Sequence, residues 1–169
     1  MSALDSLQVL LVDDNQHMRA IVAAVLKGAG VKRIVEVTDG AQALETLRQR
    51  PCDLAIVDFN MQPLDGVEFT RLVRNAPDSA NPYLPIIMMT GHAERSRVCE
   101  ARDAGVNEFV VKPITARAVL SRIQAVIFKP RAFVRTDAYF GPDRRRVNDP
   151  HYTGPFRRAD DAAGKIDAA

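Results

Sequence analysis

The stretch Leu54-Ala55-Ile56-Val57-Asp58-Phe59-Asn60 decides the fold that we expect for this chain. Four apolar residues in a row predict a strand buried on both faces, as in parallel sheets. The run ends at the carboxylate of Asp58, after which Asn60 and Pro63 turn the chain toward a helix near Gly66. An acid in this place is suited to ligand binding in an open α/β sheet, although a loop acid or helix cap would fit this stretch equally well.

Four further apolar segments alternate with helical patterns around this strand. Strands are expected at 8–12, 33–37, 85–90 and 108–111, and helices at 16–28, 40–50, from 66 onward, at 94–104 and at 114–128. Five strands alternating with five helices predict a parallel sheet covered by helices on both faces. In such a sheet the carboxyl ends of all strands lie along one edge.

Composition divides the chain into two parts. Residues 1–128 carry 14 basic and 15 acidic side chains, whereas residues 129–169 carry 9 and 6. We expect one domain over residues 6–128. Residues 129–169 form an arginine-rich extension that is too short and too polar for a domain of its own. Two cysteines without metal spacing and no membrane-length apolar stretch predict a cytoplasmic protein.

Polar residues stand at the ends of four expected strands. Asp13 and Asp14 follow the first strand, Asp58 ends the third, Thr90 ends the fourth and Lys112 follows the fifth. Clustered carboxylates repel one another unless a hard cation joins them, and oxygen ligands suit Mg²⁺. A lysine charge and a hydroxyl donor beside them describe a site where a carboxylate attacks phosphorus. Taken singly, each residue could instead be a solvated acid, a helix cap or a surface lysine.

With these residues in place, the chain resembles the receiver domain of two-component response regulators, of the CheY-like class, over about residues 6–128. The resemblance implies a flavodoxin-like (βα)5 sandwich with sheet order 2-1-3-4-5, the order that CheY itself illustrates. It also implies a sensor histidine kinase or phosphotransfer protein as the phosphoryl donor. An independent enzyme activity is not expected, because the visible chemistry acts on the chain's own Asp58.

The resemblance also assigns roles to individual residues. Asp58 matches the phosphoacceptor, Thr90 the switch hydroxyl, Lys112 the phosphate-facing lysine and Phe109 the switch aromatic. Asp13, Asp14 and Asp58, with the main-chain carbonyl of Asn60, match the protein ligands of Mg²⁺. The Lys112-Pro113 peptide is expected to be cis, and the signalling surface to span about residues 93–127.

The extension contains a sequence repeat. Tyr139-Phe140-Gly141-Pro142-Asp143-Arg144-Arg145-Arg146 is echoed by Tyr152-Thr153-Gly154-Pro155-Phe156-Arg157-Arg158. Three Arg-x-x-Asp pairs follow from it: Arg146 with Asp149, Arg157 with Asp160, and Arg158 with Asp161. Arginine stacks on bases and binds guanine edges or phosphates, and aspartate accepts from guanine donors. Gly-Pro pairs suggest turns.

The extension resembles the arginine-rich tails of the CheY-like cyclic di-GMP effectors. This implies cyclic di-GMP as a ligand of the tail and an output partner such as the flagellar motor switch. The predicted binding residues are Tyr139, Arg144, Arg145, Arg146, Asp149, Tyr152, Arg157, Arg158, Asp160 and Asp161. Three alternatives stay open: a phosphorylation-driven adaptor whose tail docks on a protein, a tail that binds nucleic acid, and a solvated basic tail. No DNA-binding motif is visible.

Overall fold

The computed structural model describes residues 3–91, 96–144 and 165–166. The strands of its main sheet are β1 (Gln8–Val12), β2 (Arg33–Val37), β3 (Leu54–Asp58), β4 (Ile86–Thr90) and β5 (Glu108–Val111). All neighbouring pairs are parallel, in the order β2-β1-β3-β4-β5. The predicted flavodoxin-like order is therefore confirmed.

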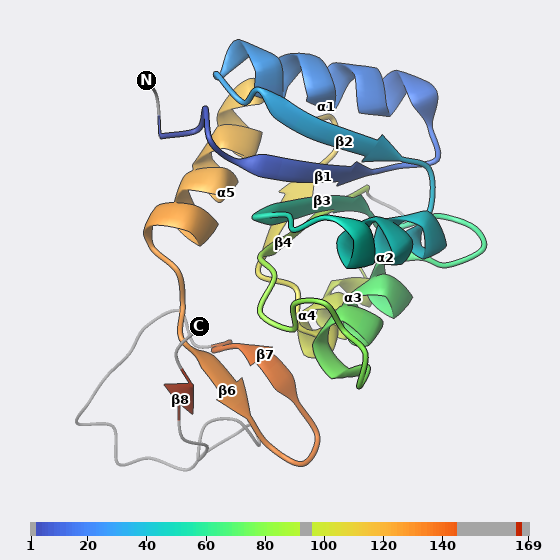
Figure 1. Ribbon diagram of the computed structural model, residues 1–169, viewed down its shortest axis with the longest axis vertical. Coiled ribbons are helices and arrows are strands. Elements are labelled where there is room, and N and C mark those ends of the chain that lie inside the picture. The colour runs from blue at the N-terminus through green and yellow to red at the C-terminus, as the bar shows by residue number, and fades with distance from the viewer. Residues whose placement is uncertain (1–2, 92–95, 145–164, 167–169) are drawn as a thin grey trace.

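Five described helices cover this sheet (Figure 1). They are α1 (Gln16–Gly28), α2 (Gly40–Gln49), α3 (Gly66–Asn75), α4 (Val98–Ala104) and α5 (Ala116–Phe128). α1 and α5 pack on one face of the sheet, and α2, α3 and α4 pack on the other. The third strand is buried along its whole length, as its apolar run predicts.

Side-chain caps fix where several helices begin. Asn15 caps α1 through the backbone N–H of Met18, and Asp39 caps α2. Asp65 and Glu68 form a reciprocal capping box at α3. The expected helix at 94–104 is described as an α-helix only from Val98, and residues 92–95 lie outside the described part.

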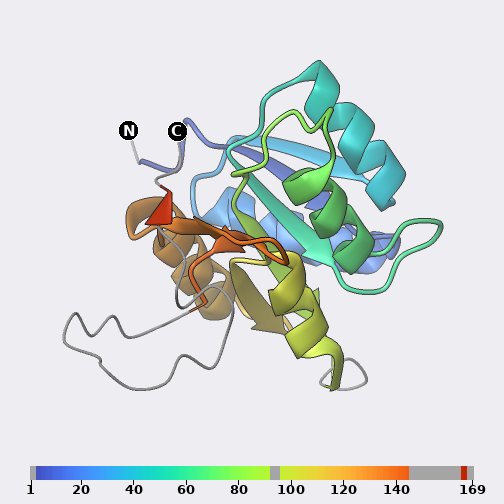
Figure 2. The same ribbon diagram turned by 90° about the horizontal axis from the view of Figure 1, so that it is seen from below.

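The extension begins with strands that the sequence analysis did not assign. β6 (Phe133–Arg135) pairs antiparallel with β7 (Phe140–Pro142) and with β8 (Lys165–Ile166). Gly141 and Pro142 lie in β7, so the turn expected there is wrong, and the chain reverses over residues 136–139 instead. This hairpin lies beside the α3 and α4 side of the domain (Figure 2).

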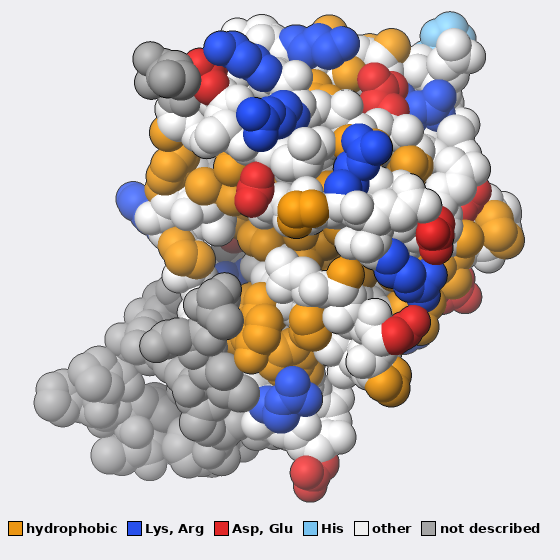
Figure 3. Space-filling model, in the orientation of Figure 1, with side chains coloured by type: hydrophobic (Ala, Val, Ile, Leu, Met, Phe, Trp, Pro, Cys, Tyr) orange, Lys and Arg blue, Asp and Glu red, His pale blue; other side chains and the backbone are white. Residues whose placement is uncertain are grey.

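Aromatic side chains attach the hairpin to the domain. Phe133 and Phe140 are buried, and both rings contact the ring of Tyr83. Hydrophobic side chains gather where the hairpin meets the body (Figure 3). Burying such rings supplies a large part of the packing energy of a small contact. The start of the extension is thus packed on the receiver-like fold.

A buried arginine completes this attachment. Arg74 at the end of α3 is 2% exposed and donates hydrogen bonds to the Gly105 carbonyl, the Pro82 carbonyl and the Asn107 side chain. Its guanidinium lies 5.0 Å from the centroid of the Phe133 ring. Burial lowers the pKa of Arg74 to about 9, which leaves it charged at neutral pH.

Candidate functional site

The predicted acidic residues meet at the carboxyl ends of the strands. Carboxylate oxygens of Asp13, Asp14 and Asp58 all lie within 4.8 Å of one another. Asp13 and Asp58 are buried, whereas Asp14 is exposed. The prediction that these three acids share one edge of the sheet is confirmed.

Among the described ion pairs, Lys112 is the only cation that contacts Asp58. Its ammonium group donates to Asp58 Oδ1 at 2.7 Å. The backbone N–H of Lys112 donates to the carbonyl of Thr90 at 2.7 Å, which ties the end of β4 to the residue after β5. The Lys112-Pro113 peptide is cis, as expected, and Gln62-Pro63 is cis as well.

Asp13 is held in place from two directions. Its Oδ1 accepts the backbone N–H of Asn15 at 2.8 Å, and its main-chain carbonyl accepts from Arg19 Nη1 at 2.7 Å. Its Oδ2 is buried and accepts no hydrogen bond in the described part of the chain. A buried carboxylate oxygen without a partner is costly, so this atom is suited to a cation ligand.

Burial raises the pKa of both inner acids. The pKa of Asp58 rises to about 6, mainly because burial removes the carboxylate from water and also because Asp13 is close, while Lys112 opposes the rise. The pKa of Asp13 is also raised, again first by burial. A divalent ion would compensate both effects.

The donor set fits magnesium. Asp13, Asp14 and Asp58 would hold the ion through carboxylate oxygens, which are the ligands that Mg²⁺ prefers. Asn60, the fourth predicted ligand, is exposed two residues beyond Asp58, and the part assigned to its carbonyl stays a prediction.

The switch candidates lie on β4 and β5, the two strands that follow β3 in the sheet. Thr90 is 2% exposed at the end of β4. Phe109 in β5 is half-buried and packs against the core on the α2, α3 and α4 side. The two residues are therefore on neighbouring strands, and their part in a conformational switch stays a prediction.

Two supporting residues were missed by the sequence analysis. Arg19 holds the Asp13 carbonyl, and its only sequence signal is its place one turn into α1. Gly66 begins α3 against β3, where a Cβ would lie 2.5 Å from the Asp58 carbonyl oxygen. Any side chain at Gly66 would push α3 away from Asp58.

Of the ten tail residues predicted to bind nucleotide, the structure describes two. Tyr139 is buried, and its hydroxyl donates to the Pro142 carbonyl at 2.7 Å. Arg144 lies over the Tyr139 ring and pairs with Asp103 at 2.5 Å. The other eight lie outside the described residues: Arg145, Arg146, Asp149, Tyr152, Arg157, Arg158, Asp160 and Asp161.

Comparisons with known proteins agree with this geometry. A family model for the response regulator receiver domain matches residues 9–124. The chemotaxis protein CheY of Pseudomonas aeruginosa is 36% identical over 120 residues, covering 71% of this chain and 95% of that protein. CheY-3 of Vibrio cholerae is 33% identical, covering 72% of this chain and 92% of that protein.

Solved structures give the same result. Vibrio cholerae CheY4 is 30% identical with a TM-score of 0.65, covering 72% of this chain and 98% of that one. The receiver domain of the Pseudomonas aeruginosa sensor histidine kinase PA1611, solved with a magnesium ion coordinated in its active-site cleft, is 29% identical with a TM-score of 0.63. That match covers 70% of this chain and 94% of the receiver structure. In the described part of this chain, no helix is long and apolar enough to span a membrane.

Proposed function

This chain belongs to the CheY-like response regulator receiver family of two-component signalling, and from that premise we propose that it is a phosphorylation switch whose phosphoacceptor is Asp58. The observation that carries the proposal is the 2.7 Å contact of Lys112 with Asp58, beside two further carboxylates at the same edge of the sheet. Receiver domains bind Mg²⁺ in such an acidic site and work with histidine kinases and output proteins.

The chemistry follows from the placement of these side chains. A carboxylate oxygen of Asp58 attacks the phosphorus of a phosphohistidine, a P–O bond forms, and the P–N bond to the imidazole breaks. Lys112 is placed to neutralise charge on the transferred group, and Thr90 offers a hydroxyl donor. When bound, Mg²⁺ supplies further charge neutralisation at the phosphoryl oxygens.

The test uses the full chain with acetyl phosphate and Mg²⁺. We expect the wild type to gain one phosphoryl group by mass spectrometry and Asp58→Asn to gain none. Asp78→Asn is the matched control, because Asp78 is an exposed carboxylate on a loop that pairs with Arg48. Phosphorylation of Asp58→Asn at the wild-type rate would refute the assignment.

We propose further that the arginine-rich extension binds cyclic di-GMP and that the output partner is a motility component such as the flagellar motor switch. The support for the ligand is the duplicated Tyr-x-Gly-Pro motif with its Arg-x-x-Asp pairs. The support for the partner is the similarity to chemotaxis proteins of two bacteria. The alternative is an adaptor whose tail docks on a protein or nucleic acid.

Calorimetric titration with cyclic di-GMP, with and without beryllofluoride as a phosphoryl mimic, tests this proposal. Truncation after Arg144 retains the β6–β7 hairpin and removes the second repeat. We expect the full chain to bind and the truncated chain to bind much more weakly. Equal binding by both chains would exclude the second repeat as the site, and no binding by the full chain would favour the adaptor.

A further inference from the structure

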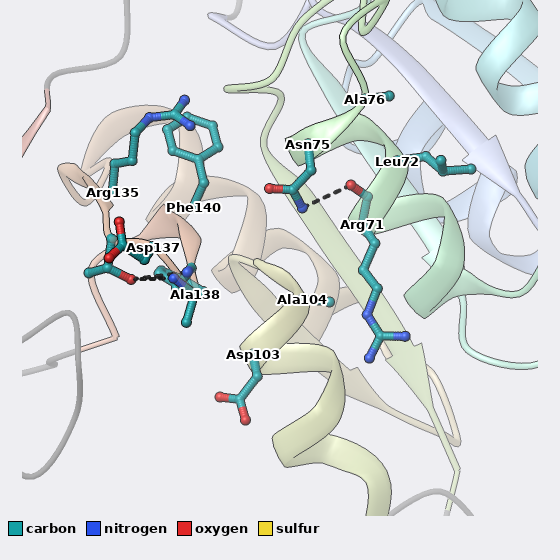
Figure 4. Close-up of a pocket in the computed structure, with 12 residues that line it drawn as sticks. Arg71, Leu72, Asn75, Ala76, Asp103, Ala104, Arg135, Asp137, Ala138 and Phe140 are labelled. Carbon is teal, nitrogen blue, oxygen red and sulfur yellow. Dashed lines mark hydrogen bonds between the residues drawn. The ribbon is translucent and has the colours of Figure 1, made fainter.

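A hollow of about 630 Å³ opens between α3, α4 and the turn that joins β6 to β7 (Figure 4). The residues that line it come from both the receiver body and the extension. They are Arg71, Leu72, Asn75 and Ala76 of the α3 region, Asp103 and Ala104 of α4, and residues 135–140 of the hairpin. The acidic cluster at Asp58 takes no part in this lining.

One wall of the hollow presents a stacked guanidinium. Arg135 is exposed, and its guanidinium carbon lies 4.0 Å from the centroid of the buried Phe140 ring. Figure 4 shows it lying over that ring, so the ring shields one side of the guanidinium. In the described part of the chain Arg135 forms no ion pair. A planar cation held over a ring in this way is suited to stacking against a nucleobase on its open side.

The opposite wall combines a donor and an acceptor. Arg71 reaches from α3 toward α4, where its partner Glu100 lies 3.4 Å away. Asn75 donates its amide hydrogen to the Arg71 carbonyl at 3.0 Å, and its amide oxygen points toward the side of Arg135 and Phe140 (Figure 4). An amide acceptor that faces the hollow is suited to the donor edge of guanine.

Positive charge exceeds negative charge around the hollow. Glu100 is shared by Arg71 and Arg97, and Asp103 is shared by Arg102 and Arg144. Together with Arg135 and Asp137, four guanidinium groups (Arg71, Arg102, Arg135 and Arg144) stand beside three carboxylates in the residues that line the hollow or pair with its lining. The surplus favours an anionic ligand.

We propose that this hollow is part of the guanine-dinucleotide site, with Arg135 stacking on a base and Arg71 contacting a phosphate. The inference rests on the proposed binding of cyclic di-GMP and moves part of that site from the tail to the receiver body. Tyr139, a residue of the first sequence repeat, lines the same hollow. Arg144 of that repeat is paired with Asp103, so the first repeat meets the body here.

Calorimetry with cyclic di-GMP on the full chain tests the proposal. We expect Arg135→Gln and Arg71→Gln each to raise the Kd by at least about five-fold, since stacking and charge-assisted contacts are lost. Arg135→Lys keeps the charge but removes the planar face, so it should also weaken binding. Arg33→Gln is the matched control, because Arg33 is an exposed arginine of the edge strand β2. Thermal melts establish that each variant is folded.

The outcomes separate this inference from the function on which it rests. Wild-type binding that Arg71→Gln and Arg135→Gln leave unchanged would overturn the hollow as a site, while binding by the tail would stand. An equal loss in Arg33→Gln would also overturn it, because the effect would then be one of net charge. A wild-type chain that does not bind would remove both proposals. Should Arg135→Gln fail to fold, Arg135→Lys and Arg71→Gln decide the matter.

Discussion

Two buried charges lie at opposite ends of the sheet. At the carboxyl ends of β3 and β5, the ammonium group of Lys112 lies 2.7 Å from the buried carboxylate of Asp58. Near the amino ends of β4 and β5, the guanidinium of Arg74 donates to neutral oxygens instead. The first arrangement crowds like charges together, and burial raises the pKa of Asp58 to about 6. The second spreads one charge over three acceptors and an aromatic ring. The first edge concentrates negative charge that a bound cation would relieve, whereas the second edge holds the hairpin.

Removing the hairpin should produce the largest loss of stability. Truncation after Phe128 strips Phe133, Tyr139 and Phe140 from the body, and we expect the free energy of unfolding to fall by about 4 kcal/mol. Truncation after Arg144 keeps these rings and should cost about 1 kcal/mol, through lost strand pairing with β8. Urea denaturation measures both. Equal stability of the two truncated chains would show that the hairpin contributes nothing to the receiver.

Replacing the buried arginine tests the attachment with a single side chain. Arg74→Leu removes the side-chain donor of the Pro82 and Gly105 carbonyls and leaves the Asn107 oxygen with only the Ile86 N–H, and we expect stability to fall by about 3 kcal/mol. Arg71→Leu is the control on the same helix. Its ion pair is exposed, so its loss should lower the free energy of unfolding by less than about 1 kcal/mol. A loss no larger in Arg74→Leu than in Arg71→Leu would contradict the interpretation.

The stability of the protein should depend on pH because of the buried carboxylates at the carboxyl ends of the strands. An acid whose pKa is higher in the folded state binds more protons when folded, so the metal-free protein should lose stability as pH rises from about 4 to about 6. For Asp58 this loss is at most about 3 kcal/mol, and the Asp58→Asn variant should show a flatter curve over the same range. Added Mg²⁺ should restore stability above about pH 6. A variant curve parallel to the wild type would exclude Asp58 as the cause.

The smallest effect is expected where the extension touches α4. Arg144→Gln breaks the pair with Asp103, which is half exposed, and should cost about 0.5 kcal/mol. Thermal melts at low and high salt measure it. The difference between variant and wild type should shrink at high salt because the pair is screened. A difference that grows with salt would point to lost packing on the Tyr139 ring instead.

Sequence reasoning reached the sheet and its acidic edge because both follow from local rules. Continuous apolar runs such as Leu54–Val57 identify buried strands, and parallel pairing then brings Asp13, Asp58 and Lys112 together. The strands of the hairpin were not predicted, because its apolar side chains are few and stand among polar residues. Their aromatic partner Tyr83 is about fifty positions away in the sequence.

Helix α3 shows how tertiary contacts override the local pattern. Leu72 stands three residues after the buried Phe69, at helical spacing, yet it is 39% exposed, whereas Arg74 is 2% exposed. A periodic pattern cannot foresee that acceptors from Pro82, Gly105 and Asn107 will surround an arginine. Arg19 was missed for a similar reason, since its contact with the site is through the backbone carbonyl of Asp13.

The junction between the hairpin and the body brings two glycines together. A Cβ on Gly141 would lie 2.9 Å from the Cα of Gly105, and Gly105 itself has a φ of +111°. Neither position accepts even a methyl group without moving the hairpin. Receivers that carry larger residues at both places must seat any following segment differently. Glycines at the positions of Gly105 and Gly141 therefore indicate, in related sequences, an extension that packs on the receiver in this way.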